Sequence, residues 1–431
     1  MLCDRYDNAL LTTSQKARDH YDAGLDSLLS GMPDMTERFA RAVEADPGFA
    51  LGHVGLARAR MIGADMVGAR EAMRDARKLA EGLPAKQAAH LHTMGLLIDG
   101  NAAGAREAVR EHVRSHPRDV LIAQLCTSVF GLIGFSGMPG READQLAYTA
   151  ALLPHYGDED WWILSQHAFS LCEVGRLDEA SDMIDRSLAL RPQNAHAAHV
   201  RSHTYYEAGE TETGRAYLDA WLPGYSPKGL LHAHLAWHSA LWAMEQDDMD
   251  RLWQAVDAHI RPSASQAAPI IKLTDAAAIL YRAELAGQTV APERWQEVSR
   301  YALDAFPNGG LAFVEFHAAL AHAMAGNPEA LHAVLENAKG PLAEIVQACG
   351  EAFAAITRSA WSEAVAHLTV ALADHARLGG SRAQRDLLEL SMLHALLKMG
   401  RGEEARRLLA LRRPVFGDHV PLAAWQRTVL H

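Results

Sequence analysis

The sequence has no apolar run of about 18 residues, the length that a membrane-spanning helix requires. It also lacks a basic run, and acidic residues outnumber basic ones by 53 to 41. Nucleic acids and anionic membrane surfaces are therefore poor candidates for partners. The first residues, MLCDRYDNALLTTSQ, lack the basic start and apolar core of a signal peptide. These absences predict a cytoplasmic protein with neither a membrane nor a nucleic-acid partner.

Cysteine is scarce, with four residues among 431, and no two of them form a CxxC pair. Cys3, Cys126, Cys172 and Cys349 therefore indicate reduced thiols in a cytoplasmic protein, and a disulfide framework is not expected. The sequence also lacks a nucleophile elbow, a phosphate loop, a dinucleotide fingerprint and a zinc-protease motif. We therefore expect no nucleotide cofactor.

Prolines recur along the chain at intervals of 33 to 38 residues. They are Pro47, Pro84, Pro117, Pro154, Pro192, Pro227 and Pro262. A tetratricopeptide unit is about 34 residues long and has a proline near its end, because proline cannot continue the second helix. In the clearest units a glycine ends one helix and an alanine follows about five residues later, as in GRLDEA and GRGEEA.

This spacing predicts an all-α, tetratricopeptide-type superhelix, an α-solenoid. We predict one domain over residues 1–431, built from about ten to twelve helical hairpins. A first helix is expected at about residues 15–29. Regular repeats follow over about 31–262, a less regular segment over 263–309 and further repeats over 310–412. A solenoid of this length can wrap around its own concave groove and enclose a small molecule.

Two histidine pairs are spaced i, i+4, so the members of each pair share one helical face. They are His199/His203 and His234/His238, and corresponding members are 35 residues apart, about one repeat. Both pairs fall at positions 5 and 9 of the first helix of a repeat, which usually face the groove. The repeat register also places Trp162 and His394 on that surface.

Several segments resemble the tetratricopeptide repeat protein 38 family, which includes a StaR-like bacterial branch. They are DPGFALGHVGLA, AHVRSH, HLAWHSAL, FVEFHAALA and GGSRAQRD (379–386). Asp275, Arg282, Arg294 and Trp295 also occupy positions where members of that family carry similar residues. The resemblance covers nearly the whole chain and implies an α-helical fold. It implies no settled activity, although one branch lies among antibiotic-biosynthesis proteins.

The chain departs from the family pattern at three places. Tyr206, followed by Glu207, replaces an acid after the second histidine of AHVRSH, and Ala236 replaces the first of two tryptophans. Val314 replaces an asparagine, while the acid beside it is retained as Glu315.

The four histidines have three interpretations. Four imidazole nitrogens on two neighbouring helices suit zinc at His199, His203, His234 and His238. Imidazoles also suit acid–base chemistry or hydrogen bonding to a ligand. The third interpretation is hydrogen bonding between helices that serves the fold alone. We expect no cofactor, with His203 and His238 as acid–base residues and His199 and His234 as their orienting partners.

The GGSRAQRD segment predicts a helix start, with two glycines in a tight turn and Ser381 as the cap. Ser381, Gln384, Arg385 and Asp386 are candidates to bind polar groups of a ligand, since a helix N-terminus beside an arginine suits an anion. The alternative is a buried pair of Arg385 with Asp386 or with Glu315, which locks the last repeats together.

The sequence therefore predicts a protein that binds a small, anionic organic ligand in an enclosed groove. Trp162, Trp237, Glu315 and His394 complete the candidate ligand-binding residues. The activity would be that of a His-dependent acid–base enzyme, of the hydrolase, lyase or isomerase type. The alternative is a scaffold that grips a peptide or a partner helix, a common use of helical repeats.

Overall fold

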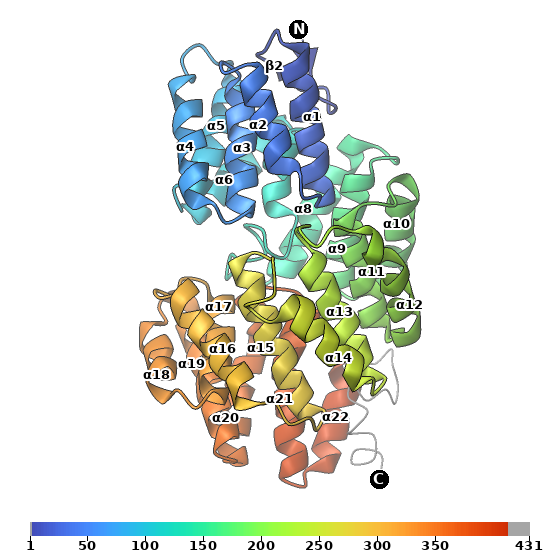
Figure 1. Cartoon of the computed structure of the whole chain (residues 1–431), viewed down its shortest axis with the longest axis vertical. Helices are drawn as coiled ribbons and strands as arrows, with labels where there is room; N and C mark the ends of the chain where they lie inside the picture. The colour runs from blue at the N-terminus through green and yellow to red at the C-terminus, as the bar shows by residue number, and fades with distance from the viewer. Residues whose placement is uncertain (1, 413–431) are drawn as a thin grey trace. The chain divides into compact units, whose positions relative to one another are not determined.

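The computed structural model describes residues 2–412, and helices occupy most of them (Figure 1). Within that range the sheet content is one antiparallel pair of two-residue strands, β1 (Leu2–Cys3) and β2 (Ala9–Leu10). The all-α prediction is confirmed, and many of the helices pack in successive pairs, as in a helical-repeat fold.

The described chain divides into two compact units. Unit 1 comprises residues 2–136, 142–201 and 228–231, and unit 2 comprises residues 137–141, 202–227 and 232–412. The boundary at residues 201 and 202 falls inside one uninterrupted helix, α11 (Ala195–Ala208). The predicted single domain over residues 1–431 stays a prediction.

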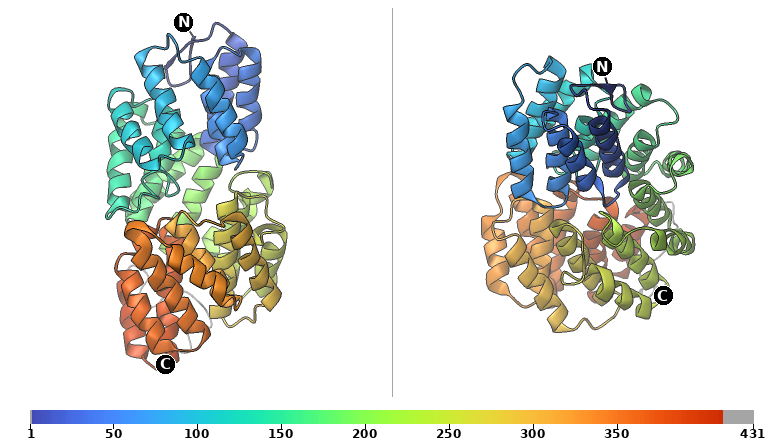
Figure 2. Two further views of the ribbon diagram at one scale, coloured as in Figure 1. Left: turned by 90° about the vertical axis from the view of Figure 1, so that its left-hand side faces the viewer. Right: turned by 45° about the horizontal axis from the view of Figure 1, so that its top comes forward.

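Unit 1 is built from helices that pack on their neighbours in the chain, such as α1 on α2 and α9 on α10 (Figures 1 and 2). Its helices before α11 are α1 (Gln15–Ser30), α2 (Met35–Ala45), α3 (Ala50–Ile62), α4 (Met66–Lys78), α5 (Ala85–Ile98), α6 (Ala102–Ser115), α7 (Val120–Ala123), the 3-10 turn η1 (Gln124–Cys126), α8 (Arg141–Tyr156), α9 (Trp161–Glu173) and α10 (Leu177–Leu190).

Unit 2 repeats the same construction, and α19 packs on both α17 and α20, which Figure 1 labels. Its elements after α11 are α12 (Thr211–Trp221), η2 (Leu222–Gly224), α13 (His232–Glu245), α14 (Met249–Ala255), the π-helix η3 (Val256–Ile260), α15 (Pro269–Leu285), α16 (Pro292–Ala305), α17 (Ala312–Met324), α18 (Pro328–Asn337), η4 (Gly340–Leu342), α19 (Ala343–Thr357), α20 (Trp361–Ala373), η5 (His375–Leu378), α21 (Arg382–Lys398) and α22 (Gly402–Arg412).

The glycine–alanine pattern has the expected structural role. Gly175 and Gly400 follow first helices of hairpins and adopt φ of 82° and 72°, a left-handed conformation that costs other residues energy. Ala180 and Ala405 lie fully buried on the second helices. A small side chain at that position lets the two helices of a hairpin approach closely.

Most of the regularly spaced prolines lie between helices, as the sequence predicts, but not all of them do. Pro192 lies between α10 and α11, as predicted. Pro154 instead lies inside α8, which continues to Tyr156. Between Pro117 and α8 the expected first helix is reduced to α7 and η1, followed by a segment with glycines at 131, 134, 137 and 140. The high cost of glycine within a helix accounts for this interruption.

The cysteines are all free thiols. Cys3 is exposed, whereas Cys126, Cys172 and Cys349 are buried. Burial raises the pKa of the Cys126 thiol to about 12.

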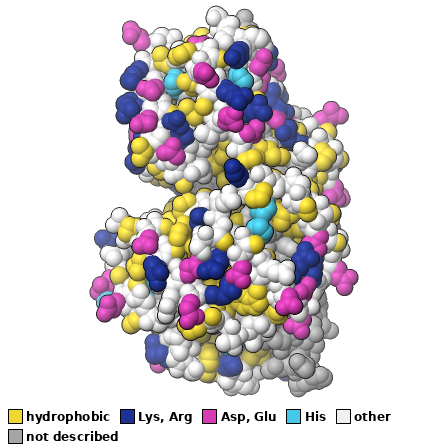
Figure 3. Space-filling view, viewed as in Figure 1, with side chains coloured by type: hydrophobic (Ala, Val, Ile, Leu, Met, Phe, Trp, Pro, Cys, Tyr) yellow, Lys and Arg dark blue, Asp and Glu magenta, His cyan; other side chains and the backbone are white. Residues whose placement is uncertain are grey.

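Within residues 2–412 no helix combines the length and the apolar composition needed to cross a bilayer. On the face shown in Figure 3, acidic and basic side chains are interspersed in small groups. Typical pairs in unit 2 are Arg294 with Asp257 and Arg261 with Glu297.

Candidate functional site

Helices α11 and α13 place three of the predicted histidines together in unit 2. Residues 232–244 of α13, HAHLAWHSALWAM, contain no Asp, Glu, Lys or Arg, and all of them are buried. His234 and His238 lie one turn apart on this helix, and His203 is fully buried on α11. A helix without a charged face is buried on all sides, so its histidines enter the interior with it.

The imidazoles of His203, His234 and His238 form what we call the imidazole centre. The ring centroids of His203 and His238 are 4.7 Å apart, and those of His234 and His238 are 5.0 Å apart, both edge to face. One nitrogen of each ring lies within 4.8 Å of the corresponding nitrogens of the other two. These three predicted residues are therefore brought together.

A buried carboxylate lies behind one imidazole of this centre. His234 Nδ1 is 2.7 Å from Oδ2 of Asp275 on α15, and both side chains are 3% exposed. We assign the proton to Nδ1, so that His234 donates to the carboxylate and its Nε2 carries the lone pair. Asp275 was noted in the sequence for its family position but was not assigned to the site.

Burial determines the charge state of the other two imidazoles. It holds the pKa of His203 well below its ordinary value, and the neighbouring His234 lowers it further. Burial also lowers the pKa of His238, with added contributions from His203, His234 and Arg282. Both rings are therefore neutral near pH 7 and offer lone pairs.

Trp237 and Arg282 lie beside the imidazole centre. The Trp237 ring stacks on His234 with a centroid distance of 5.2 Å and an interplanar angle of 9°. The Arg282 guanidinium lies 5.7 Å from the centroid of Trp237. Trp237, a candidate ligand-binding residue from the sequence, therefore lies beside His234, and a cation that the sequence analysis did not assign to the site adjoins it.

Arg282 connects this region to α21. Its Nη1 donates to the hydroxyl of Tyr206 over 3.2 Å, and its Nη2 donates to the carbonyl oxygen of Ala383 over 2.5 Å. The Tyr206 hydroxyl donates in turn to Oδ2 of Asp386 over 3.0 Å. Tyr206, which departs from the family pattern, therefore joins the cation to the predicted residue Asp386.

The start of α21 is built as the sequence predicts. Ser381 accepts from the backbone N–H of Gln384, and the Gln384 side chain accepts from the backbone N–H of Ser381, which forms a capping box. Arg385 is buried and donates to the carbonyl oxygen of Gly380, as does Arg141 over 2.7 Å. Ser381 and Gln384 therefore order the helix start itself.

The remaining predicted residues lie elsewhere or have other contacts. Trp162 is buried in unit 1 against Tyr156, with ring centroids 5.0 Å apart. His394 is half-buried with its ring edge on Trp361. His199 lies one turn before His203 on α11, so the two share a helical face.

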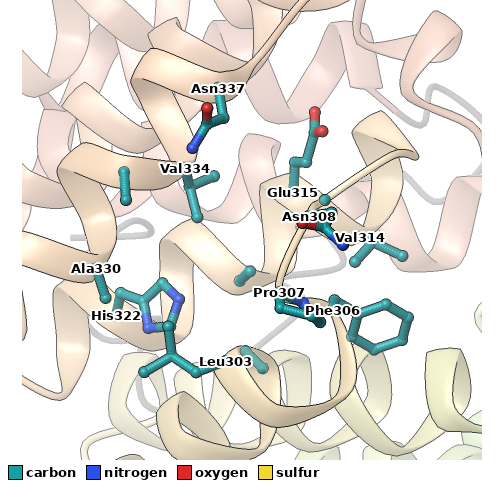
Figure 4. Close-up of a pocket in the computed structure, with 14 residues that line it drawn as sticks. Leu303, Phe306, Pro307, Asn308, Val314, Glu315, His322, Ala330, Val334 and Asn337 are labelled. Atoms are coloured by element: carbon teal, nitrogen blue, oxygen red, sulfur yellow. The ribbon is translucent and has the colours of Figure 1, made fainter.

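Glu315 accepts from the backbone N–H of Gly310 and lines a small cavity among α16, α17 and α18 (Figure 4). This cavity has about 70 Å³ of space open to water-sized molecules. Figure 4 shows Glu315 and His322 far apart across a mostly apolar lining. The cavity includes none of the three imidazoles of the centre.

A second histidine cluster, in unit 1, was not found from the sequence. His90 Nδ1 on α5 and His112 Nε2 on α6 lie 2.9 Å and 2.8 Å from the same oxygen, Oδ2 of Asp119. All three side chains are buried, and Asp119 directly precedes α7. We call this group the His–Asp–His clamp. His90, His112 and Asp119 lie on α5, on α6 and just before α7, so no single helical face relates them in the sequence.

Charge is balanced differently in the clamp. Burial opposes the charge of Asp119, but His90 and His112 outweigh it and hold the pKa of this carboxyl below its ordinary value. Asp119 is therefore ionised, and both ring nitrogens that face it act as donors.

No protein-family model matches the chain. Solved structures that it resembles include human IFIT1, a dimer with PPP-AAAA, at 14% identity and a TM-score of 0.44 over 97% of this chain and 95% of that one. Yeast Tom70 follows at 11% identity and a TM-score of 0.38, over 97% and 88% of the two chains. The P58(IPK) TPR domain has 14% identity and a TM-score of 0.21, over 92% and 99%.

Proposed function

We propose that unit 2 binds a small, anionic organic ligand at the imidazole centre and acts on it through these imidazoles. The observation that carries the proposal is the burial, in one connected region, of three imidazoles with the carboxylate of Asp275 and the guanidinium of Arg282. Such groups are expensive to bury, and they gather where a site requires them.

Buried polar atoms without protein partners support a ligand over a purely structural role. Among the described residues, none offers a hydrogen bond to Trp237 Nε1, Asp275 Oδ1 or Arg282 Nε. A buried polar group left unpaired costs roughly 1–3 kcal/mol. A polar ligand that accepts from the indole and guanidinium N–H groups and donates to the carboxylate would remove these costs.

The proposed chemistry follows from neutral, buried imidazoles. Such rings accept a proton or a hydrogen bond, which is the first half of the acid–base role expected for His203 and His238. His234 joins them, because Asp275 fixes its ring and leaves Nε2 as the acceptor. Arg282 supplies the positive charge that favours an anionic ligand. The reaction class stays that of a hydrolase, lyase or isomerase without a nucleotide cofactor.

Native mass spectrometry of freshly purified protein, beside its denatured mass, tests this proposal. We expect an organic adduct on the wild type and on Arg294→Met, whose arginine pairs with Asp257 away from the centre. The adduct should be lost in Arg282→Met and reduced in the milder Tyr206→Phe. A panel of carboxylates and organic phosphates in thermal-shift assays provides the second readout. No adduct and no stabilising panel member would refute the proposal.

The helical-repeat fold itself favours a second candidate, a scaffold for a peptide or a partner helix. Repeats of this type present surfaces suited to such partners. Pull-down of a partner that binds Arg282→Met as well as the wild type would favour the scaffold.

We also propose that the chain is a member of the tetratricopeptide repeat protein 38 family. The segment GGSRAQRD supports this assignment. Asp275 and Arg282, which occupy positions where the family carries similar residues, also support it, because both lie beside the imidazole centre. The cytoplasmic location stays a prediction.

A further inference from the structure

We propose that the imidazole centre holds one divalent transition-metal ion, preferably zinc, through His203, His234 and His238. Asp275 would act as the outer carboxylate that orients His234. The inference rests on the site of the proposed function, but not on the identity of its organic ligand.

The donor set fits zinc. Three imidazoles offer nitrogen ligands of the kind that zinc binds at about 2.0–2.1 Å. In a tetrahedral site, such bonds place ligand nitrogens about 3.4 Å apart. The three rings already bring one nitrogen each within 4.8 Å of the others, so small side-chain rotations close the remaining gap. The edge-to-face ring planes, at 79° and 77°, let the rings approach one point from different directions.

The contact between His234 and Asp275 gives independent support. Zinc-binding histidines usually donate their second ring nitrogen to a carboxylate or a carbonyl, which fixes the tautomer and increases the basicity of the ligating nitrogen. His234 Nδ1 makes such a contact over 2.7 Å. The Nδ1 atom of His317 on α17 lies 2.7 Å from the carbonyl oxygen of Phe313. This histidine is also buried, but it is not part of the centre.

The helices provide the rigidity that a metal site needs. His234 and His238 are spaced i, i+4 on α13, and His203 lies on α11, so two helices hold all three ligands. Pure imidazole ligation favours zinc, copper or nickel over calcium or magnesium, which prefer oxygen ligands.

A bound zinc ion would supply Lewis acidity and would lower the pKa of a bound water. The histidines would then act as ligands, and the anionic ligand would bind where Arg282 also provides charge.

The His–Asp–His clamp provides a matched control within the same chain. It also has two buried histidines and a carboxylate, but its nitrogens lie 2.9 Å and 2.8 Å from one carboxylate oxygen and already donate to it. A metal ion there would have to displace two formed hydrogen bonds. The variant His112→Ala therefore removes a buried histidine without affecting the centre.

The test measures metal content and zinc binding in the full chain, purified without a metal-affinity tag. Elemental analysis should find about one zinc per chain in the wild type and in His112→Ala, and a loss of at least tenfold in His203→Ala and in His238→Ala. Protein stripped with a chelator and titrated with zinc alone should regain one equivalent by native mass spectrometry. Cobalt(II) should give the absorption of a tetrahedral nitrogen site.

Circular dichroism and gel filtration establish that each variant is folded, and His238→Gln replaces any alanine variant that is not. Stripped wild type that takes up no zinc, or His238 variants that retain it, would overturn the inference. An organic adduct on protein that takes up no zinc would leave the proposed function standing and remove the zinc site. Zinc without any organic ligand would do the opposite.

Discussion

The two buried histidine clusters use the same residue types in opposite arrangements. In the clamp of unit 1, one carboxylate lies between two imidazoles and receives a hydrogen bond from each. In the imidazole centre of unit 2, the carboxylate of Asp275 lies outside the group, behind His234. The position of the carboxylate decides whether it joins two imidazoles or contacts only one of them.

This difference separates a structural role from the chemical role that we propose for the centre. The clamp ties α5, α6 and the start of α7 together at one charged oxygen, and its ring nitrogens are already bonded there. The centre instead brings one nitrogen of each of three rings within 4.8 Å of the others, and an arginine lies beside it. Residue type and burial alone would have assigned both clusters the same function.

The largest expected effect is on the clamp. Replacing Asp119 by alanine leaves two buried imidazoles without their charged acceptor and should lower the free energy of unfolding by about 3–5 kcal/mol. Urea denaturation measures it. The control, Asp99→Ala, breaks an exposed pair with Arg77 and should cost less than about 1 kcal/mol. Equal losses in the two variants would contradict a structural role for the clamp.

Asp4, another carboxyl of unit 1, should make the free energy of unfolding depend on pH. Burial raises the pKa of Asp4 to about 6 from 3.8, despite hydrogen bonds from Asn8 and from the backbone N–H of Tyr6. Its contribution to stability is full below pH 3.8 and is lost as the pH rises to 6. Wild type should therefore lose up to about 3 kcal/mol relative to Asp4→Asn between pH 4 and 6, and no more above it. The control Asp7→Asn, at an exposed carboxyl, should show no such change in urea denaturation across this range.

The variant Asp275→Asn tests the outer carboxylate of the centre. It retains an oxygen acceptor but lowers the basicity of His234, so the zinc affinity should fall about 10- to 100-fold. Competition titration against a chromogenic chelator measures this. The metal-free protein should lose less stability than Asp119→Ala does. An unchanged zinc affinity together with a large loss of stability would make Asp275 a second clamp residue.

The smallest effect concerns Tyr206. Tyr206→Phe removes one hydrogen bond to Asp386 and one from Arg282, and it should lower the free energy of unfolding by about 1–2 kcal/mol. Tyr301→Phe is the matched control, because its hydroxyl makes only a 3.4 Å contact with the carbonyl oxygen of Pro269. A loss in Tyr206→Phe no larger than in this control would show that the network contributes little.

The repeat pattern predicted the helices better than it predicted the sites. Proline spacing and the glycine–alanine pairs indicate helical hairpins because each hairpin needs the same turn and the same close contact. The histidine register brought His203, His234 and His238 together for the same reason. Pro154 departs from that pattern because it lies inside α8. The glycines between 131 and 140 interrupt the pattern, since clustered glycines disfavour a helix.

The partners of the histidines could not be read from the repeats. Asp275 lies 41 residues from His234, in the segment 263–309, where no repeat register applies. His90, His112 and Asp119 come from three successive elements with unequal spacing. Such contacts depend on how helices pack across hairpins, and a periodic sequence pattern carries no information about that packing.

The distribution of thiols leaves one cysteine accessible for labelling in the native protein. With Cys126, Cys172 and Cys349 buried and Cys3 exposed, a maleimide dye should attach at Cys3 alone in the native protein. Its emission would then report on the opening of the β1–β2 ribbon and of unit 1. Tryptophan fluorescence in the same sample would follow both units, because Trp161 and Trp162 lie in unit 1 and Trp237 and Trp242 lie in unit 2. A difference between the dye signal and the tryptophan signal would therefore show that the two units open separately.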